Sequence, residues 1–119
     1  MRHYQPKNKN PYQLPHNVYM QCLYAVRDYD RLKQEVQDIL HDQAGQHDPT
    51  GQKAIRRAHL QERCDAIEQA LNTIPQEYRR GVIWITQDEG HYPIDASPET
   101  YRRWRRRFLY EMAQRLWMV

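Results

Sequence analysis

CLYAVRDYDRLKQEVQDIL, residues 22–40, carries apolar side chains at steps of three and four residues. That spacing places them along one face of an α-helix, and it predicts one long amphipathic helix over residues 15–43. Gly45 follows where the pattern fades and suits a C-terminal helix cap. The stripe comprises Cys22, Ala25, Val26, Tyr29, Leu32, Val36, Ile39 and Leu40.

A second apolar stripe follows a short polar loop and predicts an antiparallel helix over residues 50–73. Together the two helices would form a long helical hairpin within residues 14–74, with Cys22 and Cys64 on its buried faces. Two cysteines are too few for a disulfide framework and lack metal-ligand spacing, so we expect both to be reduced core residues. The second stripe comprises Ile55, Ala58, Cys64, Ile67, Leu71 and Ile74.

Two further helices are expected in residues 75–119. Pro75 suits the first turn of a helix over residues 75–87, and Ser97 followed by Pro98 predicts the start of another over residues 97–117. Residues 1–13 lack periodicity and are expected to form a mobile N-terminal arm. The sequence therefore predicts an all-α fold, with the long hairpin followed by an abbreviated helix-turn-helix.

Length and composition favour one small folded domain. The chain has 119 residues and a net charge of +3, too short for a large two-domain enzyme and too weakly charged for typical disorder. Leu, Ile, Val and Phe fill only 21 positions, but nine tyrosines and three tryptophans add apolar area. No run approaches the roughly 20 apolar residues of a membrane span, and no signal peptide is visible, so a cytoplasmic protein without a membrane partner is expected.

The last predicted helix separates charge from apolar surface. Residues 97–119 hold six arginines against two acids, Glu99 and Glu111, giving +4 where the rest of the chain sums to −1. Helical geometry places Tyr101, Trp104, Phe108, Met112 and Leu116 on one face. Arg102, Arg103, Arg106 and Arg107 spread over the other, with Arg103 expected to pair with Glu99 and Arg107 with Glu111. Such a face is either a plain solvated surface or, since arginine suits bidentate phosphate and guanine contacts, a nucleic-acid interface; we favour the latter.

No enzyme signature accompanies this helix. The six histidines are scattered rather than paired around a carboxylate, and no glycine-rich phosphate loop occurs. The single serine, Ser97, is explained by helix capping rather than by nucleophilic chemistry. We therefore expect a non-enzymatic protein with neither a metal site nor a cofactor.

Three stretches, in this order, resemble small transcriptional regulators encoded by phages and prophages of Gram-positive bacteria. They are similar to the RinA and ArpU families of late-gene regulators, whose C-terminal half resembles the DNA-contacting fourth region of sigma factors. The likeness covers the chain from about residue 12 onward. The stretches are Leu23-Tyr-Ala-Val-Arg-Asp-Tyr-Asp-Arg-Leu-Lys33, Ile74-Pro-Gln-Glu-Tyr78 and Ala96-Ser-Pro-Glu-Thr-Tyr-Arg-Arg-Trp104.

The resemblance implies a DNA-binding regulator in the bacterial host cytoplasm. Its partner would be double-stranded DNA, with host RNA polymerase as a further partner and a homodimer formed through the hairpin. Residues 90–96 leave no room for the full helix that sigma-like domains place before the recognition helix. The alternative is a non-enzymatic interaction protein, such as a polymerase adaptor or a DNA-packaging component. The resemblance places Ser97, Thr100, Arg102, Arg103 and Arg106 in the DNA-contacting part of the last helix. The charged face of that helix adds Arg107 to the expected DNA-binding residues.

Overall fold

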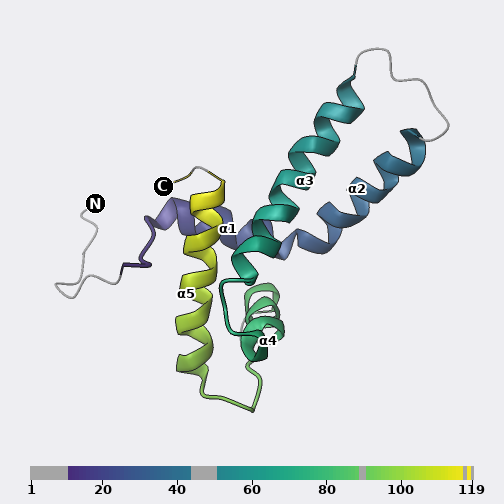
Figure 1. Cartoon of the computed structure of the whole chain (residues 1–119). Coiled ribbons are helices and arrows are strands. Elements are labelled where there is room, and N and C mark those ends of the chain that lie inside the picture. Colours follow the sequence, from purple (N-terminus) through teal and green to yellow (C-terminus); the bar gives the residue numbers. More distant parts are fainter. Residues whose placement is uncertain (1–10, 44–50, 89–90, 117, 119) are drawn as a thin grey trace.

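The protein is all-helical in the part of the chain that a computed structural model describes, residues 11–43, 51–88, 91–116 and 118. No strand occurs in these residues, which confirms the all-α class. The expected cap at Gly45 and most of the expected arm, residues 1–10, lie outside the described residues. The described residues form five helices (Figure 1): α1 (His16–Arg27), α2 (Tyr29–Gln43), α3 (Gln52–Leu71), α4 (Gln76–Gln87) and α5 (Pro98–Arg115).

The main core lies where α1, α4 and α5 meet the C-terminal half of α3. Figure 1 shows α2 and the N-terminal half of α3 projecting from this assembly. The radius of gyration is 16.8 Å, against about 13.5 Å for a compact chain of this length, because the hairpin stands apart. The buried core residues are Cys22, Val26, Ile67, Ala70, Ile74, Val82, Ile85, Tyr101, Phe108, Leu109, Met112 and Ala113.

The expectation of one continuous helix over residues 15–43 is wrong, because the chain changes direction at Asp28. Helix α1 closes with Asp28 N–H donating to the Tyr24 carbonyl at 3.0 Å, and α2 opens with Leu32 N–H donating to the Asp28 carbonyl at 2.9 Å. On a straight helix, at ~100° per residue, the buried positions of α1 and of α2 would point about 120° apart. The bend lets α1 pack in the main core while α2 packs on α3.

The hairpin is therefore formed by α2 and α3 alone. Tyr29 Oη donates to Glu68 Oε1 at 2.7 Å, and Arg56 pairs with Glu35, so polar contacts join the two helices on both sides of the seam. The buried apolar side chains of α2 are few, so the projecting part of the fold has a thin core. They are Leu32, Val36 and Ile39.

Both cysteines are buried and free, as expected, but they lie in different places. Cys64 belongs to the hairpin helix α3, whereas Cys22 lies in the main core with its Sγ 3.9 Å from Met118 Sδ. The expectation that the hairpin buries both is wrong for Cys22, because α1 turns away from α3. Burial raises the pKa of the Cys22 thiol to about 11, so this group stays protonated at neutral pH.

Close packing between α4 and the start of α5 sets the position of the arginine helix. A Cβ on Gly81 would lie 2.3 Å from Tyr101 Cε1, so only glycine allows α4 to approach this ring. The Tyr101 hydroxyl donates to Asp95 Oδ1 at 2.6 Å, which ties α5 to the preceding connector. Among the described residues of that connector, 91–97, there is no helix. The described part of the link between α4 and α5 is thus irregular.

No helix in the described ranges is long and apolar enough to cross a membrane.

Candidate nucleic-acid interface

Helix α5 begins as its sequence predicts. Ser97 is the N-cap, Pro98 occupies the first turn, and Ser97 Oγ accepts from the Thr100 N–H at 3.2 Å. The Thr100 hydroxyl lies 3.0 Å from the same oxygen. Both hydroxyls are thus engaged with each other, and the carboxylate of Glu99 sits in the same turn. The start of α5 is consequently a weaker phosphate site than a helix start with free donors would be.

The apolar flank of α5 is buried as expected. Tyr101, Phe108 and Met112 are 1% exposed or less, and Leu109 and Ala113 extend the same face into the core. Trp104 is half-buried, with its ring stacked 6.1 Å from that of Tyr78 at an interplanar angle of 21°. The expected core role of these aromatic side chains is confirmed, and it leaves the opposite arc of the helix to the arginines.

Glu99 holds two arginines near the start of α5. Its Oε2 lies 3.2 Å from Arg102 Nη2, and its Oε1 lies 3.5 Å from Arg106 Nη2. The expected Glu99–Arg103 pair is wrong, because the carboxylate turns toward the side of the helix that carries residues 102 and 106. Hydrogen bonding from Arg102, with a smaller contribution from Arg106, lowers the pKa of Glu99. Glu99 therefore stays ionised and shared at neutral pH.

Glu111 forms ion pairs with two arginines near the C-terminal end of α5. It pairs with Arg107 at 3.6 Å, as expected, and with Arg115 at 2.6 Å. Its side chain is only 15% exposed, so these pairs are better shielded from solvent than those of Glu99. Arg115 also donates to the Glu111 carbonyl at 3.1 Å. This second cluster holds Arg115 more firmly than Arg107.

Aromatic rings support the arginines that reach outward. The guanidinium carbon of Arg102 lies 5.7 Å from the centre of the Tyr92 ring, and that of Arg103 lies 5.5 Å from the Trp104 ring. A hydrogen bond with the Tyr92 side chain contributes most to raising the pKa of Arg102. Arg103 is exposed, and no carboxylate of the described residues pairs with it. The most available guanidinium of the face is thus that of Arg103.

Within the described residues, the acids that pair with Arg102, Arg106 and Arg107 come from α5 itself. The side chains of Arg102 and Arg106 are 44% and 42% exposed. Exposed ion pairs of this kind contribute about 0–1 kcal/mol each, and a polyanion can displace them. The positive face of α5 therefore persists.

Two aromatic contacts of the arginine face are not predicted by the sequence pattern. Tyr12, in the segment before α1, lies under the guanidinium of Arg107 at 4.9 Å and packs edge-on against Tyr110 at 5.4 Å. Tyr92, in the connector, lies beside Arg102. Both tyrosines lie in polar, aperiodic segments, which contain few aromatic residues. Only their rarity there signals a specific contact.

An apolar hollow of about 430 Å³ lies next to the start of α5. Trp84 is 45% exposed at its edge, and Ile94 in the connector is fully exposed. The rest of the lining is Tyr92, Pro93, Gly81 and Tyr101, together with Arg80 and two acids, Glu77 and Asp95. An exposed tryptophan and isoleucine around one hollow form a surface suited to a protein contact.

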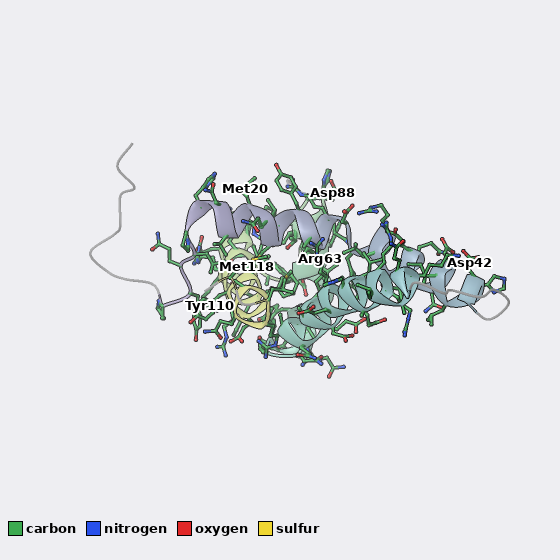
Figure 2. All side chains as sticks on the ribbon, turned by 90° about the horizontal axis from the view of Figure 1, so that it is seen from above. Met20, Asp42, Arg63, Asp88, Tyr110 and Met118 are labelled. Atoms are coloured by element: carbon green, nitrogen blue, oxygen red, sulfur yellow. The ribbon has the colours of Figure 1, made fainter. Side chains whose placement is uncertain are left out.

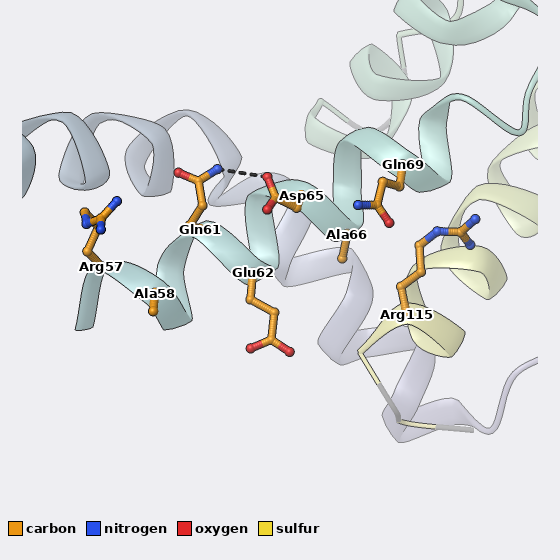
Figure 3. Close-up of a pocket in the computed structure, with 8 residues that line it drawn as sticks. All are labelled: Arg57, Ala58, Gln61, Glu62, Asp65, Ala66, Gln69 and Arg115. Carbon is orange, nitrogen blue, oxygen red and sulfur yellow. Dashed lines mark hydrogen bonds between the residues drawn. The ribbon is translucent and has the colours of Figure 1, made fainter. Parts of the chain in front are cut away.

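A second hollow, between α3 and the end of α5, has a polar lining (Figure 3). Gln61 Nε2 donates to Asp65 Oδ1 at 2.9 Å, which engages one of the two acids of the lining. In the part of the chain that is described, no three His, Cys, Asp or Glu side chains gather as a metal site would need. Among the described residues, this hollow therefore holds no metal-ligand cluster.

No family model matches the chain, and no curated protein or solved structure matches it either.

Proposed function

We propose that this protein binds double-stranded DNA through the arginine face of α5 and acts as a phage-type transcriptional regulator. The observation that carries the proposal is the exposure of Arg102, Arg103 and Arg106 on a helix whose other flank is buried. Arginine forms paired hydrogen bonds with phosphate and with the guanine edge, so such a face is suited to duplex DNA. The resemblance to RinA and ArpU regulators agrees with this role.

The individual arginines would take different parts. Arg103, which has a ring neighbour but no carboxylate in the described residues, is best placed for a direct phosphate or base contact. Arg102 and Arg106 would exchange Glu99 for phosphate, at a cost of about 0–1 kcal/mol each. Arg107 would reinforce the same phosphate track, whereas Ser97 and Thr100 would act by capping the helix that presents the arginines.

A salt titration tests the proposal. For a mixed-sequence duplex, the logarithm of the binding constant falls with the logarithm of salt concentration by about 0.9 per phosphate contacted. Replacing Arg103 and Arg106 by alanine should flatten this slope by about 2. The matched control is Arg31→Ala with Arg56→Ala, which removes two exposed cations from the hairpin and should leave the slope unchanged. Wild-type protein that retards no duplex at low salt would contradict the proposal.

A second function is favoured by the hollow around Trp84 and Ile94, namely an adaptor that docks on RNA polymerase or on a DNA-packaging component. The lining of this hollow is mostly apolar and includes side chains of both charge signs, as protein interfaces often do. The two functions separate in one comparison. Trp84→Ala should leave the salt slope for DNA intact if α5 is the DNA-binding element, and should abolish binding of purified polymerase if the hollow is the docking surface.

A further inference from the structure

The outer face of α4 and the connector that follows it share one exposed apolar patch. Trp84 on α4 is 45% exposed, and Ile94 in the connector is fully exposed. Both line the hollow of about 430 Å³, together with Tyr92 and Pro93. In Figure 1, residues 91–97 lie at the opposite end of the molecule from the projecting hairpin, so the hairpin does not cover this patch. Large apolar side chains exposed around one hollow mark an interaction surface.

Ile94 and the hollow are a projection and a recess on the same surface. Ile94 belongs to the lining, yet its side chain is uncovered, so it does not fill the space beside it. In a dimer with twofold symmetry, one patch meets an identical patch, and each copy offers the other the same residues. A projection next to a recess therefore suits a second copy, in which each Ile94 would enter the hollow of the other chain.

The charged side chains of the patch are complementary to themselves. Glu77 and Arg80 line the hollow, are both exposed, and lie one helical turn apart on the face of α4 that carries Trp84. Neither forms an ion pair with another described residue. In contrast, Asp95, the second acid of the lining, accepts from the Tyr101 hydroxyl.

These two free charges favour a second copy over a foreign partner. When two α4 helices pack antiparallel about a twofold axis, Glu77 of each copy faces Arg80 of the other, so one rotation forms both ion pairs. A foreign partner must supply one cation and one anion of its own at the matching spacing. A second copy carries both at that spacing already.

We propose that this patch pairs two copies of the chain in a twofold-symmetric dimer, with Ile94 of each copy in the hollow of the other and Glu77 of each beside Arg80 of the other. The contact lies on α4 and the connector, and not on the hairpin, where the resemblance places a homodimer. Trp84 adds a ring of the kind that dominates the energetics of many interfaces. The dimer forms without DNA.

The position of the patch links this dimer to the arginine face. Tyr92 lines the hollow and also lies 5.7 Å from the guanidinium carbon of Arg102. Tyr101 lines the hollow from the start of α5. Pairing would thus join two arginine faces in one particle with twofold symmetry, the symmetry of a palindromic duplex. This consequence rests on the proposed DNA-binding function, whereas the dimer itself does not.

Two single charge reversals test the pairing at exposed positions. Glu77→Arg and Arg80→Glu each place like charges across the axis, so each variant should dimerise at least about tenfold more weakly than wild type. Mixed in equal amounts, the two variants should form a heterodimer with nearly wild-type affinity, because each then meets the opposite charges. Sedimentation velocity over a concentration series, without DNA, measures both effects.

Ile94→Asp tests the apolar part of the contact. The residue is fully exposed, so the melting temperature of the monomer should not change, whereas a carboxylate in the hollow should weaken dimerisation by about 30-fold or more. The matched control is Ile55→Asp, since Ile55 is also an exposed isoleucine, at 57%, but lies on the hairpin helix α3. Figure 2 shows Asp42 near the outer end of that hairpin, on the opposite side of the molecule from Tyr110 on α5. The control should dimerise as wild type does.

Each outcome decides the inference. Weaker dimers for the single variants, with recovery in the mixture, support it. Wild-type protein that stays monomeric up to about 1 mM overturns it, as does a dimer that Ile55→Asp weakens and Ile94→Asp does not. Charge variants that stay apart when mixed overturn it as well. Monomeric wild-type protein that binds purified polymerase, and loses this binding in Trp84→Ala, assigns the hollow to that partner instead.

The dimer and the proposed function fail separately. Monomeric protein that retards duplex DNA overturns the dimer and leaves the DNA-binding function of α5 standing. A dimer that retards no duplex at low salt overturns that function and leaves the pairing of the two patches standing.

Discussion

Gly81→Ala separates two opposite expectations for one residue. In an ordinary helix interior, alanine stabilises relative to glycine by about 0.5–1 kcal/mol. At this position of α4, however, the new Cβ would lie 2.3 Å and 2.9 Å from two atoms of the Tyr101 ring and 3.0 Å from Pro93 Cγ. These distances require the ring or the helix to move.

The neighbours of Gly81 cannot yield cheaply. Tyr101 is 1% exposed, its hydroxyl is bound to Asp95 at 2.6 Å, and its ring packs edge-on against Tyr78 at 5.7 Å. Overpacking a core costs about 1–3 kcal/mol, and straining a hydrogen bond to a charged group adds up to about 1.5–3 kcal/mol. Subtracting the helix-propensity gain leaves a net loss of about 2 kcal/mol. For a chain of this length, that lowers the melting temperature by about 8 °C.

Thermal and urea unfolding followed by circular dichroism measure this loss. The control is a double-mutant cycle with Tyr101→Leu, because a smaller side chain should accept the new methyl group and give a coupling of about 1 kcal/mol or more. Gly51→Ala serves as a contrast, since it has no neighbour within 4 Å and differs only by its positive φ of 70°. A Gly81→Ala variant as stable as wild type, or more stable, would refute the packing argument.

Three further predictions follow from the same contacts. Burial and the Asp95 hydrogen bond raise the pKa of Tyr101 to about 12, above the ordinary tyrosine value near 10. The contribution of the neutral Tyr101 side chain to folding stability is therefore intact below pH 10 and should be lost as pH rises toward 12. Alkaline unfolding monitored at 295 nm would detect this loss. In a Cys64→Ser variant, Cys22 should resist thiol reagents until urea unfolds the protein, and rapid native labelling would contradict its burial. Glu99→Gln should strengthen duplex binding several-fold at low salt, because it releases Arg102 and Arg106 from their ion pairs. The free energy of unfolding should change by less than about 1 kcal/mol. Unchanged affinity for the duplex would show that these two arginines do not contact DNA.

The bend at Asp28 shows what hydrophobic periodicity alone misses. Spacing identifies apolar residues at helical intervals on both sides of this position, and it correctly predicts helix throughout. The error lies in treating Tyr29 as part of one continuous apolar stripe. On a straight helix, the buried residues of α1 and those of α2 would face directions about 120° apart. Tyr29 is only partly buried and uses its hydroxyl to bind Glu68. The change in the direction of the apolar face around the helix axis, more than the spacing of the apolar residues, indicates the bend.

Local signals for α5 were stronger, because capping and charge act over a few residues. Ser97 and Pro98 predict its start, and the aromatic spacing predicts its buried flank; both are confirmed. The ion pairs were less predictable. Glu99 has three arginines within reach, and which of them it pairs with depends on small differences in rotamer energy on an exposed surface. The contact between Tyr12 and Tyr110 joins residues far apart in sequence, so no local pattern encodes it.

The distribution of the two acids along α5 bears directly on its proposed role. Glu99 and Glu111 lie toward opposite ends of the arginine run, and each is shared between two guanidinium groups. One carboxylate cannot neutralise two arginines, so every pair leaves a surplus positive charge in place. Arg103, near the start of the run, pairs with no carboxylate among the described residues. On a DNA-binding face, this arrangement would hold the helix by weak pairs that phosphate can replace one at a time.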